Sequence, residues 1–444
     1  METDMLRWIV SVAALSSAGL AAWTVDTVDS QGVLGYTSSL ALDGDGRPCV
    51  AYHRDGFGVK YAWRDASGQW QREYAHQCGG SGGYTNLALD AAGSPCISYY
   101  LAWEGLCYAT RTAGSWETET VAGGSWGGST SLAIDPDGRA RIAFCEDYTG
   151  IRYARRESGG WTTETVGDGI FGFCSLQLDP DGLARVACSE KDGDDWLLRY
   201  FAESASGGWS SQTVDTTSAI HMDVSMQLDG QQYPHICYSA GDEGVRYARW
   251  TGAQWEIQTV DQFDTYAGSY ATDLVLDSQD NPVIAYCDLS DYRLRCARWD
   301  GSQWVFETVD SLEASAGYPS LEAAGDGTLH MSYYRLSGYD LLHAQREGTG
   351  VHGWQGPAGQ GLEVLPAYPN PARGSITLEL RAPAGQEVGL RVYDACGRLC
   401  RERSLTAVAS NTEVVLRGLP AGTYLCRAEA GGSAAGARFV VVGR

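Results

Sequence analysis

The chain is predicted to be all-β, with a seven-bladed β-propeller followed by a small Ig-like β-sandwich. Three observations predict this fold. Tryptophan recurs every 45 to 50 residues as far as Trp304. Between the tryptophans, short apolar runs alternate at period two and are separated by Gly, Asp, Asn or Pro. Beyond residue 364 the repeat stops and a different set of short strands begins. A fixed period of this length indicates one supersecondary unit copied many times. The recurring tryptophans are Trp23, Trp70, Trp116, Trp161, Trp209, Trp255 and Trp304.

Each repeat contains four predicted strands. The first is a small polar residue followed by Leu-x-Leu-Asp, as at 39–43, and a Gly-containing turn follows it. The second resembles Ile-Ala-Tyr at 284–286, and the third Val-Arg-Tyr-Ala at 245–248. The fourth begins at the tryptophan, as in Trp-x-x-x-Thr-Val at 116–121. Four antiparallel strands in a ~45-residue unit is the proportion of a propeller blade. A parallel β-helix is the alternative, but its coils are usually shorter and its strands do not form hairpins.

The repeats predict a ring that is closed by the first strand of the domain. The seventh repeat lacks a good fourth strand, because its Trp-Gln-Gly-Pro at 354–357 cannot sustain a ladder. At the other end, 23–28 matches a fourth strand that no repeat precedes. We therefore expect this strand to complete the seventh blade, which removes the open sheet edges. First strands are expected near residues 38, 85, 130, 174, 224, 272 and 319.

The N-terminal segment has the pattern of a secretory signal. Arg7 precedes an apolar run that extends to residue 22 and ends in small residues. The run is too short and too rich in small residues for a membrane span. Residues 1–22 are therefore predicted to be a signal peptide, and 23–347 the propeller. The mature chain is expected to have no membrane span.

The C-terminal region begins with a Gly-rich segment, 348–363, which is predicted to be a linker. The short strands of 364–444 predict a small β-sandwich. Four motifs follow in order: Tyr-Pro-Asn-Pro at 368–371, Val-Tyr-Asp-x-x-Gly-Arg at 392–398, Pro-Ala-Gly-Thr-Tyr at 420–424 and Phe-Val-Val-Val at 439–442.

Together these motifs resemble the C-terminal sorting domain of type IX secretion cargo, in the group related to the Ig-like domain of a flagellar-hook capping protein. The resemblance implies transport across the outer membrane by the secretion machinery, and then removal of the tail or attachment at the surface. Cys396, Cys400 and Cys426 depart from that pattern. The repeats also resemble uncharacterised secreted bacterial repeats, which implies a fold and a location but no ligand. The expected location is the exterior or the outer cell surface.

Charge and cysteine content narrow the range of partners. The net charge of −23 disfavours nucleic acid, because phosphates would be repelled. High solubility, a cationic ligand or Ca²⁺ would each fit this charge. The 13 cysteines are odd in number and follow no repeated framework, so most are predicted to be small buried hydrophobes. Cys287 and Cys296 flank one hairpin loop and are the pair to test for a disulfide. The Asp-x-Asp-Gly segments are interpreted as turns, and neither a metal nor a cofactor is predicted.

The loops between second and third strands vary most, and they identify a candidate binding face. Because strand directions alternate, these loops share one face of the ring with the connections between blades. Aromatic rings beside carboxylates suit the C–H faces and hydroxyls of a sugar, or a cationic side chain of a peptide. The alternative is that each Asp closes a turn and each aromatic ring fills a gap. The candidate residues are Asp55, Phe57, Trp103, Glu104, Asp147, Tyr148, Asp194, Trp196, Asp242, Asp288, Tyr292, Tyr339 and Asp340.

The favoured function is that of a monomeric, non-catalytic binding protein, secreted or at the cell surface, whose propeller face binds glycan or protein. The alternative is a polysaccharide-active enzyme, sialidase-like or lyase-like, with an axial carboxylate site. Glycoside hydrolysis needs two carboxylates at a set separation. Glu104, Glu146 and Glu243, with Tyr148, could supply such groups. The regularity of the repeats argues against catalysis. A purely structural surface repeat is the third possibility.

Overall fold

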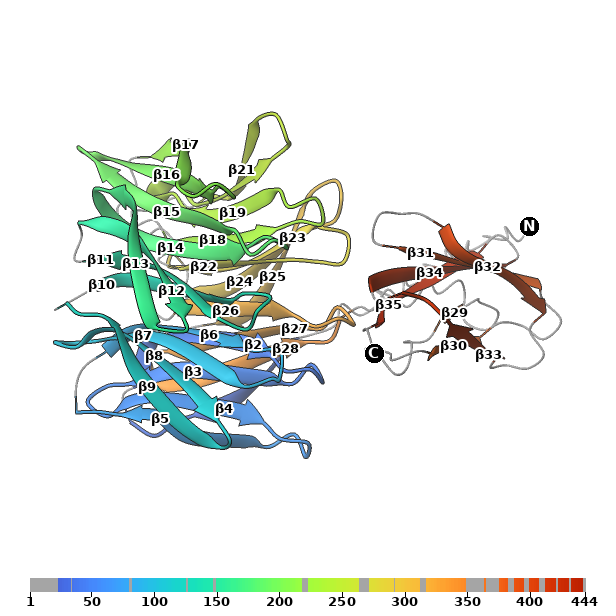
Figure 1. Cartoon of the computed structure of the whole chain (residues 1–444), viewed down its shortest axis with the longest axis horizontal. Coiled ribbons are helices and arrows are strands. Elements are labelled where there is room, and N and C mark those ends of the chain that lie inside the picture. Colours follow the sequence, from blue (N-terminus) through green and yellow to red (C-terminus); the bar gives the residue numbers. More distant parts are fainter. Residues whose placement is uncertain are drawn as a thin grey trace, which may run out of the picture. The chain divides into compact units, whose positions relative to one another are not determined.

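The computed structural model divides the chain into two compact units, Met1–Glu347 and Gly348–Arg444, which are described separately (Figure 1). In the first unit the structure describes residues 23–347, apart from 33, 80–81, 125–126, 147–148, 218–222, 263–270, 291 and 312–316. In the second it describes 348, 363–364, 375–381, 387–394, 399–406, 412–420, 422–430 and 433–441. The predicted signal peptide and most of the predicted linker lie outside these residues.

The first unit consists of seven four-stranded antiparallel sheets, blades I to VII. Blade I contains β2 (Leu34–Leu42), β3 (Pro48–Arg54), β4 (Gly58–Arg64) and β5 (Trp70–Gln77). Blade II contains β6 (Gly82–Leu89), β7 (Pro95–Leu101), β8 (Gly105–Thr112) and β9 (Ser115–Ala122). Blade III contains β10 (Gly127–Ile134), β11 (Ala140–Glu146), β12 (Gly150–Glu157) and β13 (Gly160–Asp168). Blade IV contains β14 (Ile170–Leu178), β15 (Ala184–Asp192), β16 (Asp195–Glu203) and β17 (Trp209–Thr217).

The remaining three blades follow in the same order. Blade V contains β18 (Val224–Leu228), β19 (Pro234–Ser239), β20 (Val245–Trp250) and β21 (Trp255–Asp261), with the short 3-10 helix η1 (Gly241–Glu243) between its second and third strands. Blade VI contains β22 (Thr272–Leu276), β23 (Pro282–Asp288), β24 (Arg293–Trp299) and β25 (Trp304–Ser311). Blade VII contains β26 (Gly317–Ala323), β27 (Leu329–Arg335), β28 (Asp340–Arg346) and β1 (Thr24–Asp29). Sheets built from consecutive hairpins exclude the parallel β-helix.

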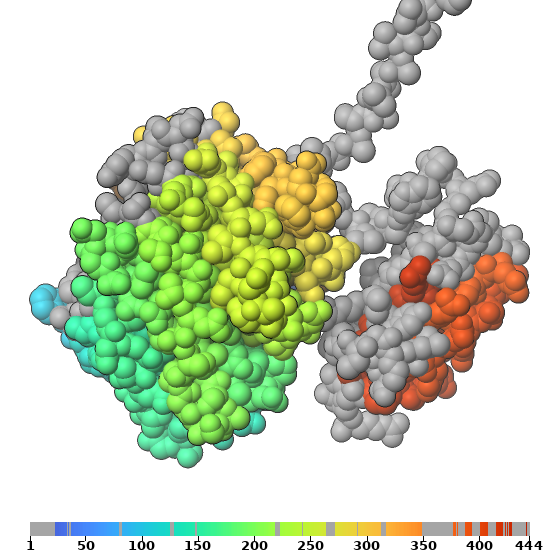
Figure 2. All heavy atoms as spheres, turned by 90° about the horizontal axis from the view of Figure 1, so that it is seen from above, coloured from blue at the N-terminus to red at the C-terminus, as the bar shows by residue number. Residues whose placement is uncertain are grey.

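The N-terminal strand completes the last blade, as the sequence predicts. β1 pairs antiparallel with β28, with Thr24 opposite Gln345 and Thr27 opposite Leu342. First strands of successive blades contact one another, and β26 of blade VII contacts β2 of blade I. One buried apolar cluster joins Val28 of β1 to Leu40 of β2 and Leu341 of β28. Blades coloured green through yellow accordingly lie next to one another in chain order (Figure 2).

A ring of hydrogen bonds explains the small polar residue that opens each first strand. In every blade its side chain accepts the backbone N–H of the following first strand, at the first leucine or methionine of the motif. For example, Ser39 Oγ accepts from Leu87 N at 2.9 Å. The last bond closes the circle, because Ser320 Oγ accepts from Leu40 N at 3.0 Å. The seven acceptors are Ser39, Asn86, Ser131, Ser175, Ser225, Asp273 and Ser320.

A second ring, on the outer strands, explains the recurring tryptophan. Each indole N–H donates to the side chain three residues after the tryptophan of the preceding blade, as Trp116 Nε1 does to Glu73 Oε1 at 2.8 Å. The pattern crosses the closure, where Trp23 Nε1 donates to Glu307 Oε2 at 3.1 Å. Trp304 is the exception, because its buried Nε1 has no hydrogen-bond partner among the described residues. The six bonded donors are Trp23, Trp70, Trp116, Trp161, Trp209 and Trp255.

The Asp that ends the Leu-x-Leu-Asp motif closes the turn that follows it. Asp43 Oδ1 accepts the backbone N–H groups of Asp45 and Arg47, both at 2.9 Å. Five other blades repeat this pair of bonds, so the carboxylate oxygens are used by the turn. The equivalent residues are Asp43, Asp90, Asp135, Asp179, Asp229 and Asp277. Blade VII has Ala324 at this position.

The second unit has two sheets around one core. One sheet contains β29 (Glu363–Val364), β30 (Ser375–Arg381) and β33 (Thr412–Arg417), and the other contains β31 (Glu387–Asp394), β32 (Leu399–Thr406), β34 (Gly422–Ala430) and β35 (Ser433–Val441). Every second residue of β30 and β31 is buried in this core, as the alternation of apolar residues predicts. These residues are Ile376, Leu378, Leu380, Val388, Leu390 and Val392.

Two features bear on the cysteines and on membranes. Cys287 and Cys296, the pair singled out for a disulfide, are both buried free thiols. They do not face each other, since Cys287 lies opposite Leu294 and Cys296 opposite Ala285. Burial raises the pKa of both thiols to about 12, which keeps them protonated. Among the described residues, no helix has the length and apolar character needed to cross a membrane.

Candidate functional site

The candidate face is formed by the loops between second and third strands, which lie at the same end of the ring as the connections between blades. We call it the loop face, and the opposite end, with the Asp-closed turns, the turn face. Four aromatic side chains in these loops are strongly exposed. Trp103 is 83% exposed, Phe57 49%, Tyr292 47% and Tyr339 43%. They belong to blades II, I, VI and VII, which are consecutive around the ring. We call these four residues the aromatic arc.

Three members of the aromatic arc have a left-handed backbone. The φ angles are +74° at Trp103, +55° at Tyr292 and +58° at Tyr339. A bulky residue in this region costs on the order of 1–3 kcal/mol, and burial of these exposed rings does not offset that cost. Gly would remove the strain at each position. Strained backbone that presents an exposed ring is the kind of outlier that points to function.

Phe57 is positioned by a neighbouring cation. The Arg54 guanidinium lies 4.2 Å from the centre of its ring. Arg54 also donates from Nη1 to Tyr74 Oη at 2.8 Å, which anchors the pair to the outer strand. Because Arg54 covers one face of the ring, only the other face is available to a ligand. The carboxylates of Asp55 and Glu104 are exposed in the same loops, and Asp194 is exposed in blade IV.

The structure shows that the prediction of an exposed binding residue is wrong at two positions. Trp196 is only 8% exposed and packs in an apolar cluster with Leu198 and Tyr200. Asp288 is 3% exposed, pairs with Arg295 at 2.7 Å and accepts the N–H of Ser290 at 3.0 Å. Both residues stabilise their own loop and do not contribute to an exposed face. The local sequence of these two loops does not indicate whether a ring or carboxylate is buried or exposed.

The remaining candidate residues contribute little to the description of the loop face. Asp340 begins β28 and is partly exposed. Asp147, Tyr148 and the side chain of Asp242 lie outside the described residues.

The connections between blades add aromatic rings near the axis. Tyr84 and Tyr318 also have left-handed backbone, with φ of +49° and +51°, at bulges where the first strands of blades II and VII begin. Tyr84 contacts Phe173 of blade IV edge-on, with ring centres 5.8 Å apart. This contact passes over blade III, so aromatic side chains reach across part of the loop face.

Three carboxylates lie in the first strands or directly before one, near the axis, and none of them is among the candidate residues predicted from the sequence. Asp273 belongs to the ring of polar residues and accepts from Ser225 Oγ at 2.6 Å and from Leu321 N at 2.7 Å. Asp223 accepts from Thr272 N at 2.8 Å, and burial raises its pKa to about 7. Burial, with repulsion from Asp273, raises the pKa of Glu322 to about 8. Glu322 occupies the position that Ala41, Ala88 and Ala133 hold in blades I to III.

Comparison with known families identifies the second unit. Residues 366–442 match the family described as secretion system C-terminal sorting domain. No curated protein matches the chain by sequence. Solved structures share the propeller-like fold at low identity. A fungal alcohol oxidase of the AA5 family, in complex with copper, is 10% identical, with 96% of this chain and 100% of that chain covered and a TM-score of 0.53.

Two further structures are more distant. The SapL1 lectin in complex with alpha methyl fucoside is 15% identical, with 56% of this chain and 88% of that chain covered and a TM-score of 0.42. A PL25 ulvan lyase is also 15% identical, with 75% and 94% covered and a TM-score of 0.45. Such likenesses show the fold alone, because one fold supports many functions. The family match, by contrast, is specific: the chain carries a type IX secretion sorting domain behind a seven-bladed propeller and is exported to the cell surface or the exterior.

Proposed function

We propose that the protein is a non-catalytic binding protein of the cell exterior whose aromatic arc binds glycan. The observation that carries this proposal is the arc itself. Four exposed rings occupy consecutive blades, and three of them stand on left-handed backbone that their own packing does not explain. Ligands on propellers bind at loops of this kind, which a rigid scaffold holds in place.

The chemistry of the arc suits a sugar chain. The apolar face of a pyranose stacks on an aromatic ring, and carboxylates accept hydrogen bonds from hydroxyls. Trp103 is followed directly by the exposed Glu104, and the exposed Asp55 lies two residues before Phe57. Rings on separate blades can contact successive units of one chain, which would raise the affinity for oligosaccharides over monosaccharides.

A glycan array with the purified mature chain tests the proposal. Trp103→Ala should weaken binding at least 10-fold, because it removes the most exposed ring. Phe306→Ala is the matched control: Phe306 is 45% exposed but lies on outer strand β25, away from the loops. Equal loss in both variants, or no selective binding by the wild type, would contradict the proposal. Selective capture of a basic peptide, lost in Trp103→Ala, would assign the same arc to a protein partner.

The enzyme alternative has one specific observation in its favour. Glu322 and Asp273 are neighbouring carboxylates near the axis, and the pKa of Glu322 is raised to about 8. Burial raises the pKa of Asp273 as well, and carboxyl groups with raised pKa values are typical of functional sites. Turnover of a polysaccharide that is abolished by Glu322→Gln, with glycan binding retained, would favour the enzyme. Asp273 itself already accepts backbone and hydroxyl hydrogen bonds, which fits a structural role.

A further inference from the structure

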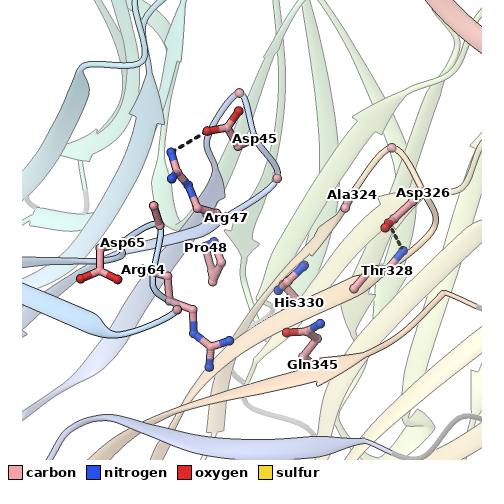
Figure 3. Close-up of a pocket in the computed structure, with 15 residues that line it drawn as sticks. Asp45, Arg47, Pro48, Arg64, Asp65, Ala324, Asp326, Thr328, His330 and Gln345 are labelled. Carbon is pink, nitrogen blue, oxygen red and sulfur yellow. Dashed lines mark hydrogen bonds and ion pairs between the residues drawn. The ribbon is translucent and has the colours of Figure 1, made fainter. Parts of the chain in front are cut away.

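A pocket on the turn face lies at the seam between blades VII and I. Its volume is about 570 Å³, and its walls come from the Asp43–Arg47 turn region, from the β4–β5 turn and from the β26–β27 turn. Figure 3 shows His330 and Gln345 of blade VII and Arg64 of blade I around the same hollow. None of these residues belongs to the aromatic arc, and the pocket is at the other end of the ring.

The pocket coincides with the one turn that lacks its Asp. In six blades the carboxylate closes the turn, and its second oxygen often contacts the second strand of the same blade. In blade III, for example, Asp135 Oδ2 pairs with Arg141 at 2.6 Å. Ala324 replaces this residue in blade VII and lines the pocket. The turn is closed instead by Asp326, which accepts from Thr328 N at 2.8 Å. The missing carboxylate leaves a gap above the second strand.

Blade V shows what the gap changes. His235 occupies the position of His330, and its Nε2 lies 3.4 Å from Asp229 Oδ2, while its Nδ1 bonds to Tyr247 Oη. In blade VII, His330 Nδ1 bonds to His343 Nε2 at 3.1 Å, but its Nε2 has no carboxylate of this turn to meet. Among the described residues, His330 Nε2 makes no hydrogen bond, and it is not one of the fully buried atoms that lack a partner. Because His330 lines the pocket, its Nε2 edge is the part that is open to the pocket.

A hydrogen-bond chain fixes the tautomer of His330. The Asp26 carboxylate is a hydrogen-bond acceptor, so His343 Nδ1, at 2.9 Å from Asp26 Oδ1, carries a proton. Burial lowers the pKa of His343, so this imidazole is neutral and its Nε2 is an acceptor. His330 Nδ1 must then donate to His343 Nε2. Burial, with the neighbouring His343, lowers the pKa of His330 to about 4. At neutral pH, His330 Nε2 is thus an unprotonated acceptor directed at the pocket.

The two arginines that line the pocket are already paired with carboxylates. Arg47 contacts Asp43 at 2.8 Å and Asp45 at 2.7 Å, and Arg64 contacts Asp26 at 2.6 Å. Asp65 closes its own turn by accepting from Ser67 N and Gln69 N. With both guanidinium groups neutralised, the described lining has no unpaired cation that would select an anion, and its remaining carboxylate, Asp326, accepts from Thr328 N. An acceptor nitrogen and the amide of Gln345 instead match a neutral ligand that carries hydroxyl donors.

We propose that this seam pocket is a second binding site, which takes a neutral, hydroxyl-rich ligand of the size of one sugar unit. His330 Nε2 accepts a hydroxyl proton, and His343 and Asp26 act as positioning residues that hold the imidazole in the accepting tautomer. The site depends on the closure of the ring, because Asp26 belongs to the N-terminal strand and both histidines belong to the last repeat. It is independent of the aromatic arc on the loop face.

The test titrates the mature full-length chain with single sugars and observes binding by calorimetry and by saturation-transfer NMR. The probes are glucose, galactose, mannose, fucose and rhamnose, with glucuronate as an anionic comparison. Ala324→Asp restores the carboxylate that six other turns contain, so the variant should fold. The new carboxylate should lie next to His330 Nε2, as Asp229 lies next to His235, and it should occupy the place of the ligand hydroxyl and disfavour the accepting tautomer. We expect a neutral sugar to bind, and Ala324→Asp to weaken that binding at least 10-fold.

Two controls separate this site from the fold and from the aromatic arc. Asp277→Ala changes the equivalent turn of blade VI and should leave binding unchanged. Trp103→Ala removes sugar binding at the aromatic arc, and Ala324→Asp in that background should still cause the same loss. The ¹⁵N shifts of the His330 ring report its tautomer independently: Nε2 should be the unprotonated nitrogen in the free protein and should shift on adding sugar. The proposal is overturned if no neutral sugar binds at millimolar concentration, if Ala324→Asp binds like the wild type, or if Nε2 carries the proton.

Discussion

The two faces of the propeller use the same residue types in opposite ways. On the turn face, Asp closes six turns with its own side-chain oxygens, and the arginines beside it are paired. On the loop face, Asp55 and Glu104 are exposed, and aromatic rings stand on left-handed backbone. Side chains that are paired with one another by hydrogen bonds or ion pairs stabilise the ring but have little capacity to bind a ligand. Groups that remain exposed, at a conformational cost, are the candidates for function.

The comparison can be tested first where the largest loss of stability is expected. Asp135→Ala removes the acceptor of two backbone N–H groups and leaves the largely buried Arg141 with Glu157 as its remaining ion-pair partner. We expect the free energy of unfolding to fall by about 2–4 kcal/mol in urea denaturation. The control is Asp43→Ala, whose Arg47 is 37% exposed, and whose loss should be about 1 kcal/mol. Equal effects would mean that burial of the ion pair contributes nothing.

Glu322 should contribute, together with Asp223, to the pH dependence near the axis. The pKa of Glu322 is raised from 4.5 to about 8, so the folded state favours the protonated acid. The contribution of Glu322 to the free energy of unfolding therefore falls as the pH rises from 4.5 towards 8. Above pH 8 this contribution no longer changes. Glu322→Gln should make this fall in the unfolding free energy shallower, with the largest gain near pH 8, while the contribution of Asp223 remains. Asp65→Asn is the control. The pKa of Asp65 is lowered to about 2, so this carboxyl group does not titrate between pH 4.5 and 8. An unchanged slope in Glu322→Gln would contradict the assignment.

The loop face should respond in the opposite direction. Trp103→Gly relieves a φ of +74° at a residue that is 83% exposed, so little packing is lost. We expect the free energy of unfolding to rise by up to about 1 kcal/mol, while glycan binding falls. Ala113→Gly, at φ +51° on the turn face, should raise stability similarly without changing binding. Destabilisation by Trp103→Gly would show that the ring packs against its loop in solution.

The sequence predicted the repeated parts of the molecule well, because each repeated residue makes the same contact in each blade. The period of Trp23, Trp70 and the tryptophans that follow them yields the number of blades and the closing strand, since their indoles bond to the preceding blade. The non-repeated parts were predicted less well. The burial of Trp196 and the gap above His330 depend on which neighbour is present in space. The substitution at Ala324 was visible in the sequence, but its effect required the His330–His343–Asp26 chain.

The smallest effect expected concerns a vacancy in the ring of tryptophans. Trp304 Nε1 is buried without a partner among the described residues, and the residue three positions after Trp255 is Gln258. Four of the six bonded indoles donate to glutamate and one to aspartate, so Gln258→Glu should supply the charged acceptor that the ring uses elsewhere. We expect a gain of about 0.5–1.5 kcal/mol in unfolding free energy, and a downfield shift of the Trp304 indole proton in NMR. Gln212→Glu is the control: Gln212 already accepts from Trp255 Nε1 at 3.0 Å, so its gain should be smaller. If Gln258→Glu gains no more than Gln212→Glu, the charge of the acceptor, and not the empty bond, limits stability at this interface.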